Sequence, residues 1–320
     1  MPKVKVVHRA YYKYTLLCYD DLMTDVITDE LIKALRLADS YELTKLAGHA
    51  NDNYLISAGD RKIVVKCLGE HTPENEQLKG VYRQYLMENG LPVAPFLKFT
   101  NGTYVFTDKG KSYVALDFVE GQEARGKEEQ VTEQVAGLLA KIHLLPHDTL
   151  PERVNWFDGG YVERVINEVQ LGGDEAGELR KQTDTFSSLW DGSLRLGIVH
   201  GDLHLGNIII DNTNQIATVI DWEEVGIVPV IFDIAGTIQS LAQTDDGYNT
   251  DLFNRFFEAY QAIRPLTHAE KSMFPEAVRY VSFIVYVWAL MKYKQGHMGH
   301  ERYQYFKRQY DQPVKVPPVR

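Results

Sequence analysis

The sequence predicts an α+β protein of two lobes, with a β-rich N-terminal lobe and a mainly helical C-terminal lobe. Strand-like patterns gather between residues 41 and 121, whereas helical patterns dominate after about residue 128. The chain has 320 residues, which is long for a single compact domain. We therefore expect one lobe over residues 1–118 and the other over residues 119–320.

The first lobe opens with a segment that has no clear pattern. Residues 1–28 mix basic, tyrosine and aliphatic residues, and their role stays open. TDELIKALRLA (28–38) predicts a short helix, because Thr28 suits its N-cap and the apolar residues follow helical spacing. Residues 41–68 predict three short strands, with the AGD turn (58–60) closing a hairpin.

A helix and two further strands complete this lobe. Thr72 as N-cap and Pro73 at the first helical position predict a helix that ends at Gly90. Residues 103–121 then predict a pair of strands. The polar stretch QEARGKEEQ, which follows Gly121, is expected to form the crossing between the lobes.

The second lobe is predicted to be helical around one strand-rich island. The apolar residues of QVTEQVAGLLAKIHLL fall on one helical face. Further helices are predicted near residues 160–190, 249–263 and 268–295. Between them, residues 196–226 predict strands and loops. A loop between strands can hold polar side chains at one point, so we look for chemistry in this island.

Composition excludes several classes of function. The net charge of −10 argues against nucleic acid as the main partner, because phosphate binding needs clustered Lys and Arg. The two cysteines, Cys18 and Cys67, fit neither a disulfide framework nor a metal site. No signal peptide is recognised, and the most apolar stretch (280–290) is too short to span a bilayer and predicts a buried helix. We expect a cytoplasmic protein with no membrane partner; its oligomeric state stays open.

The island carries a pattern of acidic and amide side chains. Asp202 and Asn207 have the spacing D-x-x-x-x-N, His200 precedes the Asp by two residues, and Asp221 ends the next apolar run. Each alone could be a turn residue, since Asp and Asn favour turns. Phosphoryl transfer needs a base near the acceptor hydroxyl and oxygen ligands for Mg²⁺. Together the residues therefore predict Asp202 as the catalytic base, with Asn207 and Asp221 as Mg²⁺ ligands.

HGDLHLGNIIID and ATVIDWEEVGIVPVIFDIA resemble the aminoglycoside phosphotransferase and choline kinase family. The resemblance covers roughly residues 45 to 290. It implies a protein-kinase-like fold, with a nucleotide-binding first lobe and a catalytic, acceptor-binding second lobe. It also implies ATP and Mg²⁺ as cofactors and the hydroxyl of a small molecule as acceptor. Asp233 would be a structural acid that steadies the loop after the metal site, His200 would orient the catalytic loop, and His204 could lie near the acceptor.

The resemblance also assigns a lysine and a glutamate in the first lobe. Lys66 ends the apolar strand KIVVK, where kinases place the lysine that pairs with the nucleotide phosphates. Glu76 in the following helix is expected to pair with it, with Glu74 as the second choice. The family's usual glutamate position, however, falls nearer Lys79.

Two backbone segments complete the expected nucleotide site. The loop GHANDNY stands where a phosphate-covering loop belongs, and it contains one glycine. Asn51 and Asn53 are therefore candidates for phosphate contacts. LDFVEG resembles the adenine-binding hinge, in which backbone groups of Asp117 and Val119 would bind adenine.

The sequence favours a small acceptor over a protein. Asp221 is followed within a short stretch by the helical pattern FDIAGTIQSLA, without DFG, APE or a long activation segment. The stretch 259–278 resembles type II homoserine kinases, which favours an amino alcohol or an amino-acid-like acceptor over a large aminoglycoside.

Four acidic residues bear on the charge of the acceptor. Glu223, Glu224, Asp245 and Asp246 could form an acidic side of the pocket, suited to an amine, or they could be solvated surface acids. Two alternative functions stay open: a compact bacterial-type protein serine/threonine kinase, and a non-catalytic nucleotide-binding module. The preference between ATP and GTP also stays open.

Overall fold

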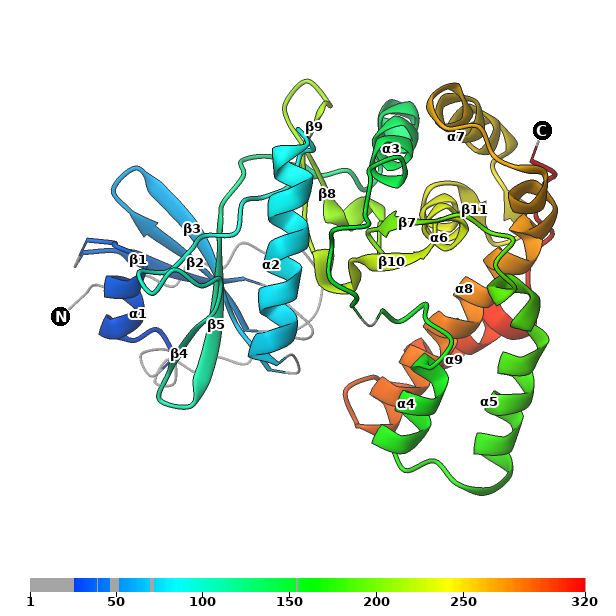
Figure 1. Ribbon diagram of the computed structural model, residues 1–320, viewed down its shortest axis with the longest axis horizontal. Helices are drawn as coiled ribbons and strands as arrows, with labels where there is room; N and C mark the ends of the chain where they lie inside the picture. The colour runs from blue at the N-terminus through cyan, green and yellow to red at the C-terminus, as the bar shows by residue number, and fades with distance from the viewer. Residues whose placement is uncertain (1–25, 39, 47–51, 70–71, 154, 320) are drawn as a thin grey trace. The chain divides into compact units, whose positions relative to one another are not determined.

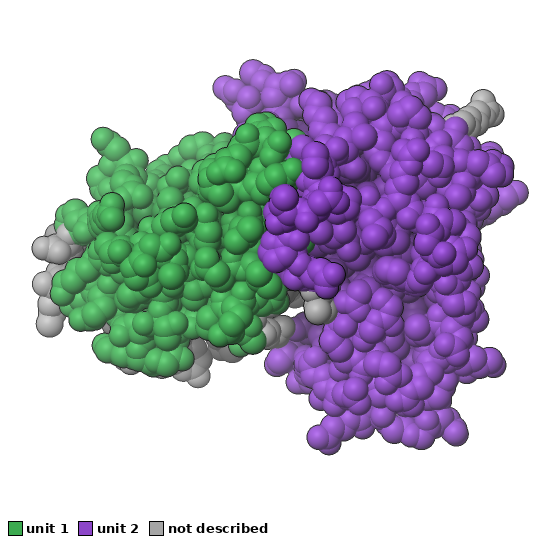
Figure 2. Space-filling view, viewed as in Figure 1, with its two compact units in different colours: residues 1–120 green, residues 121–320 purple. Residues whose placement is uncertain are grey.

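The computed structural model describes residues 26–319, except residues 39, 47–51, 70–71 and 154. The chain forms two compact units, residues 1–120 (unit 1) and residues 121–320 (unit 2), coloured separately in Figure 2. The expectations for the N-terminal arm up to residue 25 and for Asn51 lie outside the described residues. So does Cys18, whereas Cys67 is a free, partly buried thiol.

Unit 1 is built on a five-stranded antiparallel sheet with the strand order β1-β2-β3-β5-β4 (Figure 1). Its elements are α1 (Asp29–Ala34), β1 (Glu42–Leu46), β2 (Asp52–Ala58), β3 (Arg61–Cys67), α2 (Pro73–Glu88), β4 (Phe106–Asp108) and β5 (Lys111–Asp117). Alternate side chains of β2 and β3, such as Ile56 and Val65, are buried in one apolar cluster together with α1. This alternation is expected of strands that bury one face.

The predicted helix starts of unit 1 are confirmed. The Thr28 hydroxyl accepts a hydrogen bond from the N–H of Leu31 (3.2 Å), and the Thr72 hydroxyl accepts one from the N–H of Asn75 (3.3 Å). Each cap satisfies an N–H group that the first helical turn leaves without a partner. The two predicted strands after residue 103 are β4 and β5, which pair as a hairpin.

Unit 2 surrounds short strands with helices. Its helices are α3 (Glu128–His143), α4 (Tyr161–Glu168), α5 (Gly173–Thr185), α6 (Ile231–Ala242), α7 (Thr250–Ile263), α8 (His268–Lys294) and α9 (His300–Asp311), with the short 3₁₀ helices η1 (Ser187–Trp190), η2 (Leu205–Asn207) and η3 (Trp222–Glu224). Its strands are β6 (Gln122–Glu123), β7 (Leu196–Val199), β8 (Ile208–Ile210), β9 (Ile216–Val219), β10 (Gly226–Pro229), β11 (Gln243–Thr244) and β12 (Gly247–Tyr248). They form the sheets β6-β8-β9, β10-β7 and β11-β12.

The long apolar helix α8 is a core helix of unit 2. It packs against α6 and α9, and its buried side chains include Phe274, Phe283 and Val287. Among the described residues, α8 alone is long and apolar enough to cross a membrane. However, 56% of its most apolar stretch is buried within the fold. The predicted buried helix at 280–290 is thereby confirmed.

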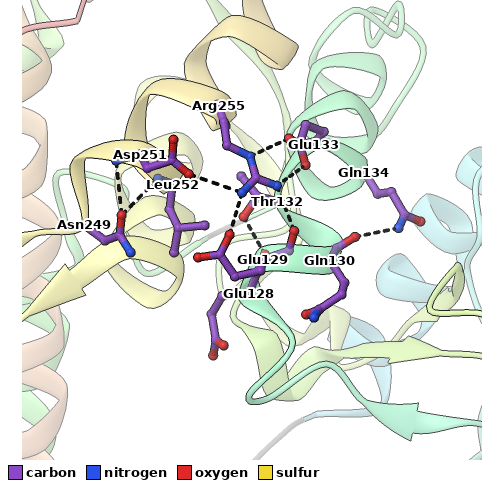
Figure 3. A network of polar contacts seen from close by, with 10 residues as sticks. All are labelled: Glu128, Glu129, Gln130, Thr132, Glu133, Gln134, Asn249, Asp251, Leu252 and Arg255. Atoms are coloured by element: carbon purple, nitrogen blue, oxygen red, sulfur yellow. Dashed lines mark hydrogen bonds and ion pairs between the residues drawn. The ribbon is translucent and has the colours of Figure 1, made fainter.

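A cluster of charges joins α3 to α7 (Figure 3). The Arg255 guanidinium on α7 lies within 2.6 Å of carboxylate oxygens of both Glu129 and Glu133 on α3. It also donates to the Glu129 carbonyl (2.8 Å) and lies 3.4 Å from Asp251. The side chain of Arg255 is 28% exposed, so its guanidinium group makes several hydrogen bonds at a position that is partly shielded from solvent. This contact fixes α7 against α3.

Two parts of unit 2 differ from the sequence expectation. The polar stretch after Gly121 is not only a crossing, because Gln122 and Glu123 form β6 and pair with β8. This pairing satisfies backbone groups that a free linker would leave to water. Helix α9 was not expected, since its sequence is mostly polar. It is held by aromatic contacts to α8, such as the stacked rings of Tyr286 and Tyr310 (5.6 Å between centroids).

Candidate active site

The loop of residues 200–207 joins β7 to β8 and is held by its own hydrogen bonds. The N–H of His204 donates to the Asp202 carbonyl (3.0 Å), and the N–H of Asn207 donates to the His204 carbonyl (2.9 Å). The Asn207 Nδ2 also donates to the Asp202 carbonyl (2.8 Å). Asp202 is half-buried and Asn207 is buried. Since Nδ2 of Asn207 is engaged, its Oδ1 is the side-chain atom left to contact a ligand.

Asp221 lies beside this loop because β8 and β9 pair. Ile208 opposes Val219, and the N–H of Ile220 donates to the Asn207 carbonyl (2.9 Å). Asn207 and Asp221 therefore stand at the same end of the β8–β9 hairpin. The Asp221 backbone is left-handed, with φ 64° and ψ 51°. Few residues other than glycine adopt this conformation, and Asp is among those that tolerate it best.

Asn207 and Asp221 offer one amide oxygen and one carboxylate to a metal ion. In the described part of the chain, no group of three or more His, Cys, Asp or Glu side chains converges as a protein-only metal site would require. Mg²⁺ commonly takes one or two carboxylates and completes its shell with water and substrate phosphates. The residues present fit a metal held jointly with nucleotide phosphates, and they do not fit a structural Zn²⁺ site.

The fully buried His200 ties the 200–207 loop to the end of β9. The N–H of Asp202 donates to its Nδ1 (3.2 Å), so the ring hydrogen is on Nε2, which donates to the Ile220 carbonyl (2.9 Å). The ring also lies 4.5 Å from that of Trp222, centroid to centroid. Both ring nitrogens are thus engaged with backbone groups, which leaves neither free for proton transfer.

Asp233 anchors the start of the 200–207 loop. Its carboxylate accepts hydrogen bonds from the N–H groups of His200 (2.7 Å) and Gly201 (3.0 Å). The expectation placed this acid at the loop after the metal site. The contact instead falls on the loop that bears Asp202, because α6 follows β10 directly and β10 pairs with β7. Burial alone would raise the pKa of Asp233, but the hydrogen bonds from the His143 side chain and the His200 backbone help to outweigh it, and that pKa is lowered.

A chain of buried polar side chains extends from Asp233 into the helices. His143 Nε2 lies 3.3 Å from Asp233, and its Nδ1 lies 2.7 Å from the Tyr260 hydroxyl. Burial lowers the pKa of His143 more strongly than the neighbouring Asp233 raises it. The ring is therefore neutral, with Nε2 donating to Asp233 and Tyr260 donating to Nδ1. One helical turn beyond Tyr260, Arg264 forms a buried ion pair with Glu270 (2.6 Å).

Glu224 packs directly on the 200–207 loop. Gly201 has φ +86°, and a Cβ atom there would lie 2.5 Å from the Glu224 carbonyl oxygen and 2.6 Å from its Cβ. Glycine is required at this position both for the backbone conformation and for the close approach. The pKa of Asp202 is raised, first by burial and then by the charges of Asp221, Glu224 and Asp233. A raised pKa makes this carboxylate a stronger base than an ordinary Asp.

The segment between α3 and α4 contacts both residues 223–225 and the 200–207 loop. The Arg153 guanidinium donates to the carbonyls of Glu223 and Val225, and Asn155 donates to that of Glu224. The backbone N–H of Trp156 donates to the Glu224 carboxylate (3.2 Å).

The indole N–H of Trp156 contacts the 200–207 loop, where it donates to the Gly201 carbonyl (2.8 Å). Sequence patterns did not indicate the roles of Arg153, Asn155 and Trp156. The one signal was an Asn-Trp pair in a loop, which by itself does not reveal what it contacts.

His204 faces the Asp202 carboxylate. The N–H of Gly206 donates to His204 Nδ1 (3.0 Å), and His204 Nε2 lies 3.9 Å from Asp202 Oδ2. Burial, Arg125 and His200 lower the pKa of His204 to about 4, so the imidazole is neutral near pH 7. Because Nδ1 accepts a hydrogen bond, the ring hydrogen is on Nε2 and points to the side of Asp202.

In unit 1, Lys66 and Asn53 stand opposite each other on β3 and β2. Directly opposed residues of an antiparallel pair share one face of the sheet. Their neighbours Tyr54 and Val65 belong to the buried apolar cluster on the other face. Lys66 and Asn53 therefore lie side by side, away from that core.

Glu76 forms an ion pair with Lys79 on the same helix (2.5 Å), and both side chains are almost completely buried. Its expected pairing with Lys66 remains a prediction. At the expected hinge, the N–H of Asp117 donates to the Pro95 carbonyl (3.2 Å), and the expected adenine contacts of the hinge remain a prediction. Val119 packs against a second apolar cluster of the unit.

Residues 42–266 match the model of the phosphotransferase enzyme family. Among curated proteins, the chain is 26% identical over 314 residues to a homoserine kinase of Rhizobium johnstonii. That alignment covers 91% of this chain and 97% of the relative.

Two solved structures show the same fold. An amicoumacin kinase in complex with AMP-PNP, Ca²⁺ and Ami superposes with a TM-score of 0.68 and 17% identity, covering 86% of this chain and 90% of that one. The choline kinase LicA of Streptococcus pneumoniae superposes with a TM-score of 0.66 and 19% identity, covering 88% and 96%. The predicted α+β, protein-kinase-like fold is thereby confirmed.

Proposed function

Because the chain belongs to the phosphotransferase enzyme family and is an ATP-dependent small-molecule kinase, we propose that its acceptor is a small alcohol that also carries an amino group. Homoserine is the first candidate, since relatives aligned over most of both chains are homoserine kinases. Choline-like amino alcohols are the second, since choline kinase shares the fold. The sequence favoured the same acceptors over a large aminoglycoside.

The observation that carries this proposal is the position of Glu224. Its Cβ and carbonyl abut Gly201, the residue before Asp202, and its carboxylate accepts the N–H of Trp156. The charge of Glu224 also contributes to the raised pKa of Tyr161, after burial. A carboxylate next to the residue proposed as the base suits an ammonium group, because opposite charges attract each other. Glu224 would thus hold the amino end of the acceptor while the hydroxyl end reaches Asp202.

Asp202 would act as the catalytic base. The acceptor hydroxyl gives its proton to the carboxylate as the oxygen attacks the γ-phosphorus. The bond from that phosphorus to the β–γ bridging oxygen breaks, and its electron pair leaves with ADP. His200 and Asp233 would keep the loop in place through the backbone hydrogen bonds described above.

Asn207 and Asp221 would hold Mg²⁺. When bound, the metal neutralises charge on the nucleotide phosphates. In unit 1, Lys66 would contact the phosphates, Asn53 would assist from the opposing strand, and the backbone of Asp117 would bind adenine. These assignments follow from the resemblance and from the strand register.

A protein acceptor is less well supported. From Asp221 the chain passes through η3 and β10 and enters α6 at Ile231, which leaves no long segment on which to lay a peptide. A cytoplasmic location fits an enzyme that consumes ATP.

The test is ADP release with a panel of acceptors: homoserine, choline, ethanolamine, methylthioribose, hexosamines and aminoglycosides. We expect acceptor-dependent release with an amino alcohol, lost in Asp202→Ala. Turnover only with sugars, or no loss in Asp202→Ala, would contradict the proposal.

Glu224→Gln separately tests whether Glu224 binds the ammonium group of the acceptor. We expect KM for the acceptor to rise about 10-fold or more, as loss of a partly shielded charged hydrogen bond implies, with a smaller change in kcat. Glu258→Gln removes the same charge from an exposed position on α7 and is the matched control. Equal KM values for the two variants would exclude Glu224 as the ammonium-binding residue.

A further inference from the structure

The side chains of His204 and Asp202 face each other across a gap of defined size. His204 Nε2 and Asp202 Oδ2 are 3.9 Å apart. This distance is too long for a direct hydrogen bond. It does allow one oxygen atom to lie about 2.8 Å from both atoms, which is a normal hydrogen-bond length.

The loop fixes which of the two groups donates. Gly206 donates its N–H to His204 Nδ1 (3.0 Å), so Nδ1 carries no hydrogen. Protonation of Nδ1 would place two hydrogens face to face and break this bond. His204 Nε2–H is therefore a donor, and the Asp202 carboxylate opposite it is an acceptor. The loop presents one donor and one acceptor to the same point.

We propose that His204 binds the acceptor hydroxyl directly, donating Nε2–H to its oxygen while Asp202 accepts its proton. This inference rests on the proposed amino-bearing alcohol and assigns a second residue to its recognition. In the reaction, the hydroxyl proton passes to Asp202 Oδ2, the oxygen forms its bond to the γ-phosphorus, and ADP leaves with the electrons of the broken bond. His204 keeps its proton throughout and orients the attacking oxygen.

This arrangement selects the correct end of an amino alcohol. A hydroxyl both donates and accepts hydrogen bonds, so it matches the donor and the acceptor of the pair. An ammonium group has three donors and no acceptor, so its hydrogens would meet the His204 Nε2–H. Asp202 alone would attract the ammonium group and hold the substrate the wrong way round. His204 makes that orientation unfavourable, and Glu224 takes the ammonium at the other end.

Two variants separate the Nε2–H donor from the structural role of the ring. His204→Asn keeps an oxygen that can accept the Gly206 N–H but has no donor at the Nε2 position. His204→Gln places an amide N–H near the position of Nε2. Calorimetry of Mg-ATP binding and thermal unfolding verify that both variants retain the fold.

The assays compare turnover of homoserine and ethanolamine with hydrolysis of ATP, in which water takes the place of the hydroxyl. For His204→Asn we expect kcat with the amino alcohol to fall about 10- to 100-fold, the loss of one hydrogen bond to the reacting oxygen. ATP hydrolysis should fall less, because water has no ammonium end to bind in the wrong direction. His204→Gln should retain most of the activity.

The outcomes distinguish the two proposals. Unchanged turnover and unchanged ATP hydrolysis in His204→Asn would overturn the role of His204. Equal loss in the Asn and Gln variants would also overturn it, since the donor would then not be the property that matters. If the wild type phosphorylates no amino alcohol but His204→Asn still slows ATP hydrolysis, the proposed acceptor is wrong and the hydroxyl contact of His204 stands.

Discussion

Replacing Asp233 by Asn tests whether one buried carboxylate holds the 200–207 loop. Asp233 is 2% exposed and accepts hydrogen bonds from two backbone N–H groups and from His143. An Asn has a single side-chain oxygen and puts an NH₂ group where the second oxygen was. At least one buried N–H group, of His200 or Gly201, then faces a donor instead of an acceptor.

The size of the effect follows from these contacts. A hydrogen bond to a charged group contributes about 1.5–3 kcal/mol, and an unsatisfied buried N–H costs about 1–3 kcal/mol. Because the two contributions overlap, we expect Asp233→Asn to lower the free energy of unfolding by about 2–4 kcal/mol. Displacement of the loop should also lower kcat about 10²-fold, which is what a small misplacement of reacting groups costs.

The matched control is Asp251→Asn. Both aspartates lie in the first turn of a helix, α6 for Asp233 and α7 for Asp251, so the change in charge at a helix N-terminus is the same. The Asp251 side chain is 72% exposed and lies 3.4 Å from Arg255, so its loss should change stability by less than about 0.5 kcal/mol. Urea unfolding followed by tryptophan fluorescence measures both variants. Equal unfolding free energies for Asp233→Asn and Asp251→Asn would refute the reasoning.

Three further predictions concern the same loop and its support. Asp221→Ala should abolish metal-dependent nucleotide binding; unchanged Mg-ATP affinity in calorimetry would contradict its role as ligand. Backbone strain alone costs about 1–3 kcal/mol, so Gly201→Ala should destabilise the protein by more than this, because the clash with Glu224 adds to the strain. Gly126→Ala, with φ +73° and open space around it, measures the strain alone, and equal losses would exclude the clash. The lowered pKa of His143 means that below about pH 6.5 the unfolded chain binds a proton that the folded chain does not. Stability should therefore fall between pH 7 and pH 5, and less steeply in His143→Gln; parallel curves of melting temperature against pH would disprove this.

Local pattern alone identified much of the protein. The caps at Thr28 and Thr72, the strands of unit 1 and the island around Asp202 are all encoded by residues close together in sequence. Helix and strand periodicity, capping residues and the D-x-x-x-x-N spacing are local features, so they survive without knowledge of the packing. The pairing of His204 with Asp202 was only partly predictable: His204 stood out in the sequence, but the position of its ring hydrogen depends on the contact with Gly206.

Tertiary packing decided which distant residues meet. Asp233 binds the N–H of Gly201 across 32 positions, and Trp156 binds the carbonyl of Gly201 across 45. Glu224 could have been a solvated surface acid, and only the close approach of its backbone to Gly201 places it at the loop. Such contacts depend on how β7 and β10 pair and on where the chain between α3 and α4 runs. Sequence periodicity does not predict these long-range contacts, because each depends on the burial and hydrogen bonding of the whole unit.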